Sequence, residues 1–140
     1  MASPPQIGKL NLPYKYWTIA VVAGEKYHVD PCKIVAVMAI ESRYKQYARN
    51  KRCKSYGLMQ IQIDVSKKYG VKNIYDPREN IECGAKILAH LLDVTNGNFK
   101  RALDIYNPEC KYGNHAYCRE VIKAYKQAKR SMINEGRLRL

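Results

Sequence analysis

The fold of this chain depends first on residues 30–42, which read DPCKIVAVMAIES. Asp30 is a favoured N-cap residue, and Pro31 suits the first helical position because the N–H that proline lacks would have had no partner there. The apolar residues then run without interruption to Ile40, which is typical of a buried segment. Periodicity alone does not separate a buried helix from a buried strand, but the cap signal favours a helix that ends near Ser42.

This predicted helix carries one carboxylate, Glu41, directly after its apolar run. Removal from water penalises the ionised form, so we expect a raised pKa for Glu41 and a proton on it near neutral pH. The alternative is a carboxylate that turns into solvent or pairs with Arg43 or Lys45, the usual situation of a glutamate at a helix end. In the first case Glu41 is a candidate general acid.

The composition indicates one basic globular domain. The 140 residues include 25 Lys and Arg against 12 Asp and Glu, a formal net charge of +13. A chain of this length buries a core without needing disulfides. Its charge favours polyanionic partners such as nucleic acid, an anionic membrane surface or the bacterial envelope, and a merely soluble basic surface is the alternative.

Cap signals and apolar spacing predict an all-α fold of about six helices, with no repeats and no alternating strand pattern. We expect an irregular lead-in over residues 1–13 and one domain over residues 14–140. A basic loop of low apolar content occupies residues 43–55. The helices are predicted over about residues 14–27, 31–42, 57–68, 77–96, 99–106 and 119–140.

The odd number of cysteines leaves at least one thiol unpaired in a monomer. Cys32 is expected to be a small buried hydrophobe. Free thiols are the default for a protein made in the cytoplasm, although Cys110 with Cys118, and Cys53 with Cys83, could form bridges. Cys110, His115 and Cys118 could also suggest zinc, but no Cys-x-x-Cys pair accompanies them, so we expect no metal and no cofactor.

Four short motifs follow one another along the chain. They are Glu41-Ser42, Gly57-Leu58-Met59-Gln60, Asn80-Ile81-x-x-Gly84-x-x-x-Leu88 and Ala102-x-x-x-Tyr106-Asn107. Over about residues 14–127 this order resembles the soluble lytic transglycosylase family, which cuts bacterial peptidoglycan. The resemblance implies a single helical domain of the goose-type-lysozyme-like fold.

The resemblance also implies a mechanism with one carboxylate. Glu41 would protonate the oxygen of the β-1,4 bond between N-acetylmuramic acid and N-acetylglucosamine, and would then act as a base on the C6 hydroxyl of the muramic acid. The product would be a 1,6-anhydro ring. Asp64 is the nearest candidate for a second acid, and we interpret it as a helix-surface residue because the family motif assigns it no role.

The remaining motif residues are expected to form the substrate site. Their implied roles are a backbone hydrogen bond at the helix end for Ser42, close approach of the chain to sugar for Gly57, lining of the cleft for Met59 and Gln60, a hydroxyl aimed at Glu41 for Tyr106, and contact with sugar or backbone for Asn107. Plain core packing is the alternative for Met59 and Tyr106.

Three departures from the family pattern affect the outer part of the expected cleft. Ile87-Leu88 stands where Tyr-Leu is frequent, Pro108-Glu109-Cys110 follows the last motif where glycine-rich sequence is frequent, and the loop after Glu41 carries charges and Cys53. A lysozyme-type hydrolase on the same fold is the alternative enzyme. A cationic envelope-binding module, or a membrane-disrupting last helix over residues 119–140, is the alternative without catalysis.

The expected partners are peptidoglycan glycan strands and the anionic bacterial envelope, met by a monomer. No nucleic-acid-binding motif accompanies the charge. Residues 1–5 lack the basic region of a secretory signal, and no apolar run approaches the length of a membrane span. Action on the cell wall would therefore need phage release, a virion, another export route, or a signal that had been removed.

Overall fold

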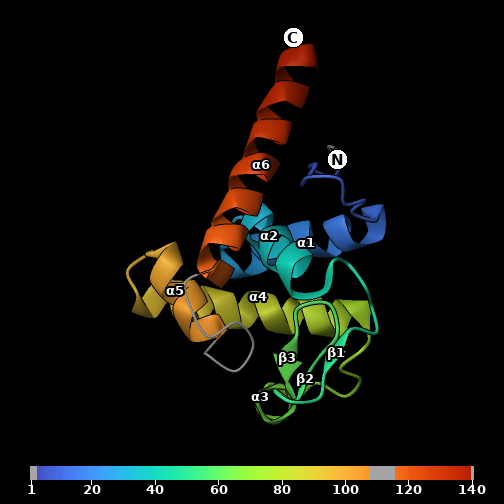
Figure 1. Cartoon of the computed structure of the whole chain (residues 1–140), viewed down its shortest axis with the longest axis vertical. Coiled ribbons are helices and arrows are strands. Elements are labelled where there is room, and N and C mark those ends of the chain that lie inside the picture. The colour runs from blue at the N-terminus through green and yellow to red at the C-terminus, as the bar shows by residue number, and fades with distance from the viewer. Residues whose placement is uncertain (1–2, 108–115, 140) are drawn as a thin grey trace.

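The computed structural model describes residues 3–107 and 116–139. Within that part of the chain the fold is mostly helical, as predicted, with one small sheet (Figure 1). The helices are α1 (Tyr14–Tyr27), α2 (Pro31–Ser42), α3 (Ile63–Lys68), α4 (Pro77–Val94), α5 (Phe99–Tyr106) and α6 (Ala116–Arg139). The strands are β1 (Arg49–Asn50), β2 (Ser55–Tyr56) and β3 (Ile61–Gln62).

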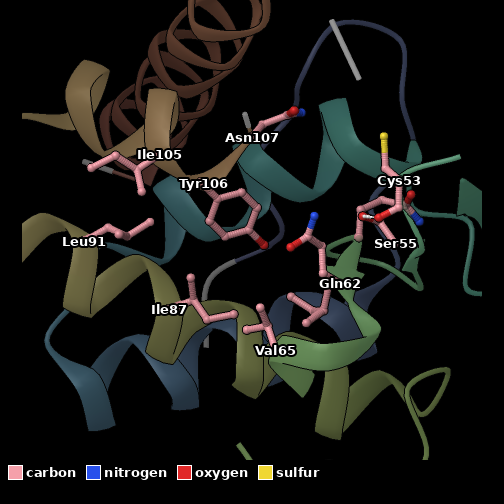
Figure 2. Close-up of a pocket in the computed structure, with 11 residues that line it drawn as sticks. Cys53, Ser55, Gln62, Val65, Ile87, Leu91, Ile105, Tyr106 and Asn107 are labelled. Carbon is pink, nitrogen blue, oxygen red and sulfur yellow. Dashed lines mark hydrogen bonds between the residues drawn. The ribbon is translucent and has the colours of Figure 1, made fainter. Parts of the chain in front are cut away.

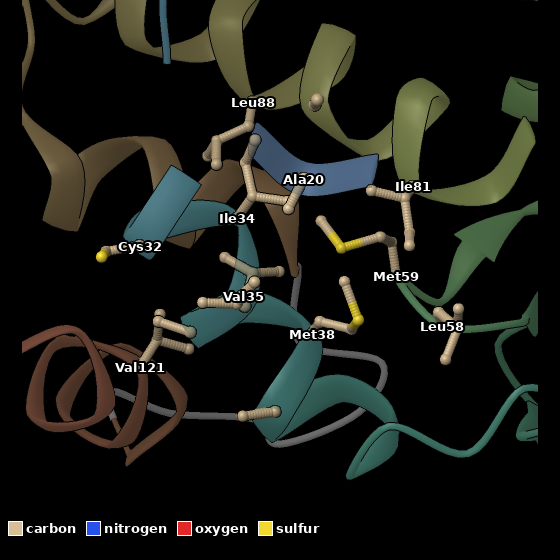
Figure 3. Packing of buried hydrophobic residues seen from close by; sticks show 14 of the residues in the cluster. Ala20, Cys32, Ile34, Val35, Met38, Leu58, Met59, Ile81, Leu88 and Val121 are labelled. Carbon is tan, nitrogen blue, oxygen red and sulfur yellow. The ribbon is translucent and has the colours of Figure 1, made fainter. Parts of the chain in front are cut away.

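Helix α2 is the centre of the hydrophobic core. It packs against α1, α4 and α6, and its residues Ile34, Val35 and Met38 are fully buried (Figure 3). Full burial of an aliphatic side chain contributes about 1.5–3 kcal/mol, so this one segment supplies a large part of the driving force for folding. The uninterrupted apolar run in the sequence reflects a helix covered on all sides.

The N-terminus of α2 is joined to α6 through the side chain of Asp30. One carboxylate oxygen accepts from the Cys32 N–H at 2.8 Å, which caps the helix. The other accepts from the Tyr125 hydroxyl at 2.9 Å and from Lys129 Nζ at 3.1 Å. Burial alone would raise the pKa of Asp30, but these hydrogen bonds and the Lys129 charge outweigh it and hold the pKa below the ordinary value.

We predict that Asp30→Asn lowers the free energy of unfolding at pH 7 by about 1–2 kcal/mol, because the cap is weakened and the contact with Lys129 loses its charge. A carboxylate whose pKa is depressed on folding stabilises the protein above its unfolded pKa, and that contribution is lost as the pH falls through the folded pKa. Urea unfolding between pH 7 and about pH 2 should therefore show the variant and the parent converging in acid.

Asp93→Asn is the matched control for this experiment, because Asp93 is exposed on α4 and the change removes the same charge. It should alter stability by less than about 0.5 kcal/mol. A difference between Asp30→Asn and the parent that stays constant over the whole pH range would contradict this account of the contact.

The three-stranded sheet is antiparallel, with order β1-β2-β3. Arg49 pairs with Tyr56, and Tyr56 pairs in turn with Ile61. Figure 1 shows the sheet and α3 on one side of α4, with α1, α2 and α6 on the other. Each strand has two residues, which is too short to produce the alternating pattern by which strands are recognised in a sequence.

The predicted helix over residues 57–68 is wrong in its first half. Gly57 and Gln60 have φ angles of 82° and 50°, values in the left-handed region that interrupt a right-handed helix. The Gly57 N–H donates to the Ala48 carbonyl at 2.8 Å and so closes a loop across the sheet. Helix α3 begins only at Ile63, while the other five predicted helices agree closely with the structure.

The expectation of free thiols is wrong for Cys53, which is disulfide-bonded. Cys83 and Cys118 are free thiols, so neither of the two bridges considered as possibilities exists. Cys110 and His115 lie outside the described residues. Cys32 is free and buried, as expected, and burial raises the pKa of its thiol to about 12.

The segment before α1 packs on the domain although it forms no helix. Ile7 and Leu12 are buried in the core, and the Gln6 N–H donates to the Ser131 hydroxyl on α6 at 2.9 Å. Helix α6 extends beyond the body of the domain (Figure 1). None of the helices in the described part of the chain combines the length and the apolar character needed to cross a membrane.

Candidate active site

A pocket of about 170 Å³ opens where the sheet, α3, α4 and the end of α5 meet (Figure 2). Side chains of mostly apolar character form one wall, and polar side chains of the sheet form the other. The lining residues are Cys53, Ser55, Gln60, Ile61, Gln62, Val65, Ile87, Leu91, Ile105, Tyr106 and Asn107.

Glu41 lies beside this pocket, in the last turn of α2. Its side chain is half-buried, like that of Ile40, whereas residues 34–39 are buried. Arg43, which follows α2, has a φ angle of 52°, so the helix ends just beyond the acid and the chain turns away. The end of the apolar helix therefore presents one carboxylate between the core and the pocket.

Asn107 connects the acid to the pocket. It lines the pocket, and its Nδ2 donates to Glu41 Oε2 at 3.4 Å. The Asn107 side chain is itself buried, and its Oδ1 has no hydrogen-bond partner among the described residues. The expectation that Asn107 contacts sugar is untested, but its position adds a contact with the acid that the sequence did not predict.

Tyr106 projects into the pocket. Its hydroxyl was expected to point at Glu41, but it does not donate to that carboxylate. Its hydroxyl donates to the Met59 carbonyl at 2.8 Å. Burial, followed by the nearby Glu41 carboxylate and Cys83, raises the pKa of Tyr106 well above its ordinary value. The phenol therefore remains a neutral donor at any physiological pH, and its one proton is used in the hydrogen bond to the Met59 carbonyl.

The motif loop over residues 56–60 is held by a side chain that the sequence did not mark as part of the site, Asn80. Its Oδ1 accepts from the Met59 N–H at 2.7 Å, and its Nδ2 donates to the carbonyls of Tyr56 at 3.0 Å and Ile74 at 2.7 Å. Asn80 is 1% exposed, so these bonds form away from water. Its place in the third motif was the available signal, but the motif did not indicate what the side chain binds.

Gly57 leaves the space in which Asn80 makes this contact. Its φ angle of 82° favours glycine, and a Cβ there would meet the Asn80 amide and lie 2.7 Å from the Ile74 carbonyl oxygen. Asn80 can reach the loop only because residue 57 has no side chain.

The side chains of Met59 and Gln60 mainly contact other parts of the protein and leave few groups free to bind a ligand in the cleft. Met59 is fully buried and packs on Gly84, where an added Cβ would lie 2.7 Å from Met59 Cγ, so core packing was the right alternative. Gln60 does line the pocket, but its Nε2 donates to the carbonyls of Ala48 at 3.0 Å and Gly57 at 2.9 Å. Those donors are therefore engaged by backbone.

Two smaller expectations also have clear outcomes. The Ser42 hydroxyl donates to the Met38 carbonyl at 3.1 Å, the backbone contact at the helix end that was predicted. Asp64 is exposed on the first turn of α3 and is not one of the pocket-lining residues. Its interpretation as a surface residue agrees with this position.

The departure at Ile87 has a structural consequence. Ile87 lines the pocket next to Leu91 and Ile105, so this wall is aliphatic (Figure 2). Ile105 is 53% exposed, unusually open for an isoleucine. The wall offers methyl and methylene groups, and no hydroxyl, to whatever enters.

Residues 19–133 match the family model described as the transglycosylase SLT domain, which covers most of the chain. The chain belongs to this family. The chain is similar to the membrane-bound lytic murein transglycosylase C of Photorhabdus laumondii, with 33% identity over 104 residues, and to the transglycosylase of Enterobacteria phage PRD1, with 34% identity over 97 residues.

These alignments cover 63% and 66% of this chain, but only 29% and 34% of the respective relatives. The chain thus spans about a third of the length of the relatives that it resembles. The fold is shared with an inactive mutant of the lytic transglycosylase Slt from Pseudomonas aeruginosa, with a TM-score of 0.62, 20% identity, and coverage of 86% of this chain and 23% of that one.

The contacts of Asn80 lead to a stability prediction. Asn80→Asp keeps the size of the side chain, but it removes both N–H donors and brings a charge to two carbonyl oxygens. Because buried groups left without partners cost about 1–3 kcal/mol each, urea unfolding should show a loss of about 3 kcal/mol. Asn134→Asp, on an exposed position of α6, is the matched control and should change stability little. Equal stability of the two variants would show that the Asn80 contacts are dispensable.

Proposed function

We propose that this chain is a peptidoglycan lytic transglycosylase that cleaves the β-1,4 bond between N-acetylmuramic acid and N-acetylglucosamine. Glu41 is the proposed catalytic residue. Membership of the SLT family supports the reaction class. The observation that carries the assignment of the site is the contact between Glu41 and Asn107, because it joins a carboxylate at the end of a buried helix to the pocket.

The described part of the pocket wall carries no second acid, and this favours an internal nucleophile. Among the described residues that line the pocket there is no Asp or Glu. A hydrolase needs a group that activates water, often a second carboxylate about 6.5–9.5 Å away in inverting enzymes. The C6 hydroxyl of the muramic acid is tethered to the reacting carbon, so its attack gains the advantage of proximity and needs only one base.

In this mechanism Glu41 changes its protonation state twice, and the amide of Asn107 can serve both states. The carboxylate accepts from Nδ2, the arrangement seen in the structure. The protonated acid would instead donate, and Oδ1 of the same amide, which has no partner among the described residues, accepts after a rotation of the amide. Asn107 is thus proposed as a positioning residue for both steps.

A chain of buried hydrogen bonds supports the opposite side of the site. Asn80 fixes Met59, the Met59 carbonyl accepts from Tyr106, and the Tyr106 ring lines the pocket next to Asn107. The aliphatic wall at Ile87 suits the methyl groups of N-acetyl substituents, which both sugars of the glycan carry. We therefore propose that Ser42, Gly57 and Met59 support the substrate site from behind its wall, and that Gln60, Tyr106 and Asn107 border the substrate.

We predict that Glu41→Gln folds normally but loses at least about 100-fold in the rate of peptidoglycan solubilisation, because an amide cannot deliver the proton that the leaving oxygen needs. The matched control is Glu25→Gln, since Glu25 is exposed on α1 and the change removes the same charge. A folded Glu41→Gln protein with near-normal activity would remove Glu41 from the mechanism.

The released products distinguish the two enzymes that this fold allows. We predict that mass spectrometry of muropeptides from purified peptidoglycan shows 1,6-anhydromuramoyl ends, each lighter by one water than the hydrolysed form, because the tethered hydroxyl outcompetes solvent. Reducing muramic acid ends as the sole product would assign the protein to lysozyme-type hydrolysis. In that case Asp64 would be the first residue to test as the base.

We place this activity at the bacterial cell wall, with glycan strands as the partner and a monomer as the acting species. A relative encoded by a phage and relatives described as membrane-bound support a role at the envelope. The formal charge of +13 favours attraction to an anionic envelope.

A further inference from the structure

One face of α6 carries a row of cations that the proposed catalytic site does not use. The row consists of Arg119, Lys123, Lys126 and Arg130, spaced four, three and four residues apart, and all four side chains are exposed. Residues at these intervals lie on the same face of a helix, and the row spans about 16 Å at 1.5 Å per residue. We refer to these four residues as the α6 cationic row.

The row borders two neighbouring hollows along α6. A hollow of about 440 Å³ is lined by Lys100, Cys118, Ile122 and Gln127 together with all four members of the row. A second, of about 510 Å³, lies further along and is lined by Lys126 and Arg130 again, with Tyr125, Lys129, Ile133 and Asn134. The two hollows follow one another along α6 and share Lys126 and Arg130, and we refer to them together as the groove.

The charges of the row are available to a ligand. Two other cations of the groove have partners in the protein, since Lys100 pairs with Asp104 at 3.7 Å and Lys129 pairs with Asp30 at 3.1 Å. Within the described part of the chain, no ion pair involves a member of the α6 cationic row, and no Asp or Glu lines either hollow. A groove lined by one sign of charge attracts a polyanion.

The shape of the groove argues against a membrane as the ligand. The apolar face of α6, including Val121, Ala124 and Ala128, is buried in the domain. Ile133, 55% exposed, is the large hydrophobic residue left open among the described residues of this helix. Insertion into a bilayer needs a broad exposed apolar face, whereas an elongated hollow fits a linear chain.

The aromatic content argues against nucleic acid. Proteins that bind single strands stack the bases on free aromatic rings. Tyr125 is the aromatic residue of the groove, but its hydroxyl donates to Asp30 and its ring packs against Phe99 with centroids 5.6 Å apart. The groove therefore offers charge along a line but no stacking surface, which suits a phosphate chain without bases.

We propose that the α6 cationic row binds a base-free phosphodiester polymer, of the polyol phosphate kind, along the helix axis. Arg119 and Arg130 at the two ends supply planar guanidinium groups that bind phosphate through two hydrogen bonds, and the lysines between them supply point charges. The lining residues of the groove and those of the catalytic pocket have no member in common. The groove thus holds an anionic polymer independently of catalysis.

The test is a calorimetric titration of the intact protein with poly(glycerol phosphate), repeated at several salt concentrations. Changing Arg119, Lys123, Lys126 and Arg130 together to Gln should weaken binding at least about tenfold in low salt, and should flatten the plot of log K against log salt by about 3 units because four contacts with a flexible chain are lost. Circular dichroism confirms folding. Glu41→Gln should bind like the parent, so failure of the proposed reaction does not affect this result.

The matched control changes Lys67, Lys68, Lys72 and Arg78 to Gln, because these exposed residues around α3 and the start of α4 carry the same total charge. The affinity of this control variant for poly(glycerol phosphate) should stay within about twofold of the parent's affinity, because charges far from the groove are screened by salt. Equal loss in the control would overturn the proposal in favour of diffuse charge. Tighter binding of single-stranded DNA with the same number of phosphates would make the groove a nucleic-acid site, and binding confined to anionic vesicles would make it a membrane surface.

Discussion

The geometry of the site depends on one buried amide. Asn80, at the start of α4, holds the loop over residues 56–60 through three hydrogen bonds, and Gly57 leaves the space in which it does so. Without that amide the buried Met59 N–H and the two half-buried carbonyls of Tyr56 and Ile74 would lose these hydrogen bonds. The loop has little regular structure of its own, so α4 fixes the position of the Met59 carbonyl, and that carbonyl fixes Tyr106.

The proposed acid is held by a different part of the fold. Glu41 comes from α2, whose apolar residues are buried between α1, α4 and α6, and its position is thus tied to the best-packed helix of the domain. Asn107, just after α5, reaches it from the pocket side. Two packed helices and one clamped loop therefore meet at the pocket, and together they fix the positions of Glu41, Asn107 and Tyr106.

Glu41 beside the pocket and the α6 cationic row lie in different parts of the molecule, and we propose different roles for them. The pocket of the proposed active site is small and largely apolar, and Glu41 lies beside it, joined to it through Asn107. The α6 cationic row is exposed and elongated, where solvent screens each charge and only several acting together bind strongly. Helix α5 borders both, since Lys100 lies in the groove near its start and Ile105 in the pocket near its end.

The sequence by itself determined the helices and the proposed acid, because their signals are local. Asp30-Pro31 and Asp76-Pro77 mark helix starts through side chains that bond within three residues, and the apolar run after Pro31 identifies the buried helix that ends at Glu41. Five of the six helices could be placed on such signals. The family motifs, read from the same residues, gave the fold class and the reaction class.

Only the tertiary structure decided what the motif side chains contact. The strands are too short to leave a pattern, and the φ angles of Gly57 and Gln60 serve contacts with Asn80 and Ala48, which lie 23 and 12 residues away along the chain. Met59 was expected in the cleft and lies in the core, and Tyr106 bonds to Met59 where Glu41 was expected. A hydrogen bond or a packing contact between distant residues depends on how the helices pack. The local sequence around either residue does not identify such a partner.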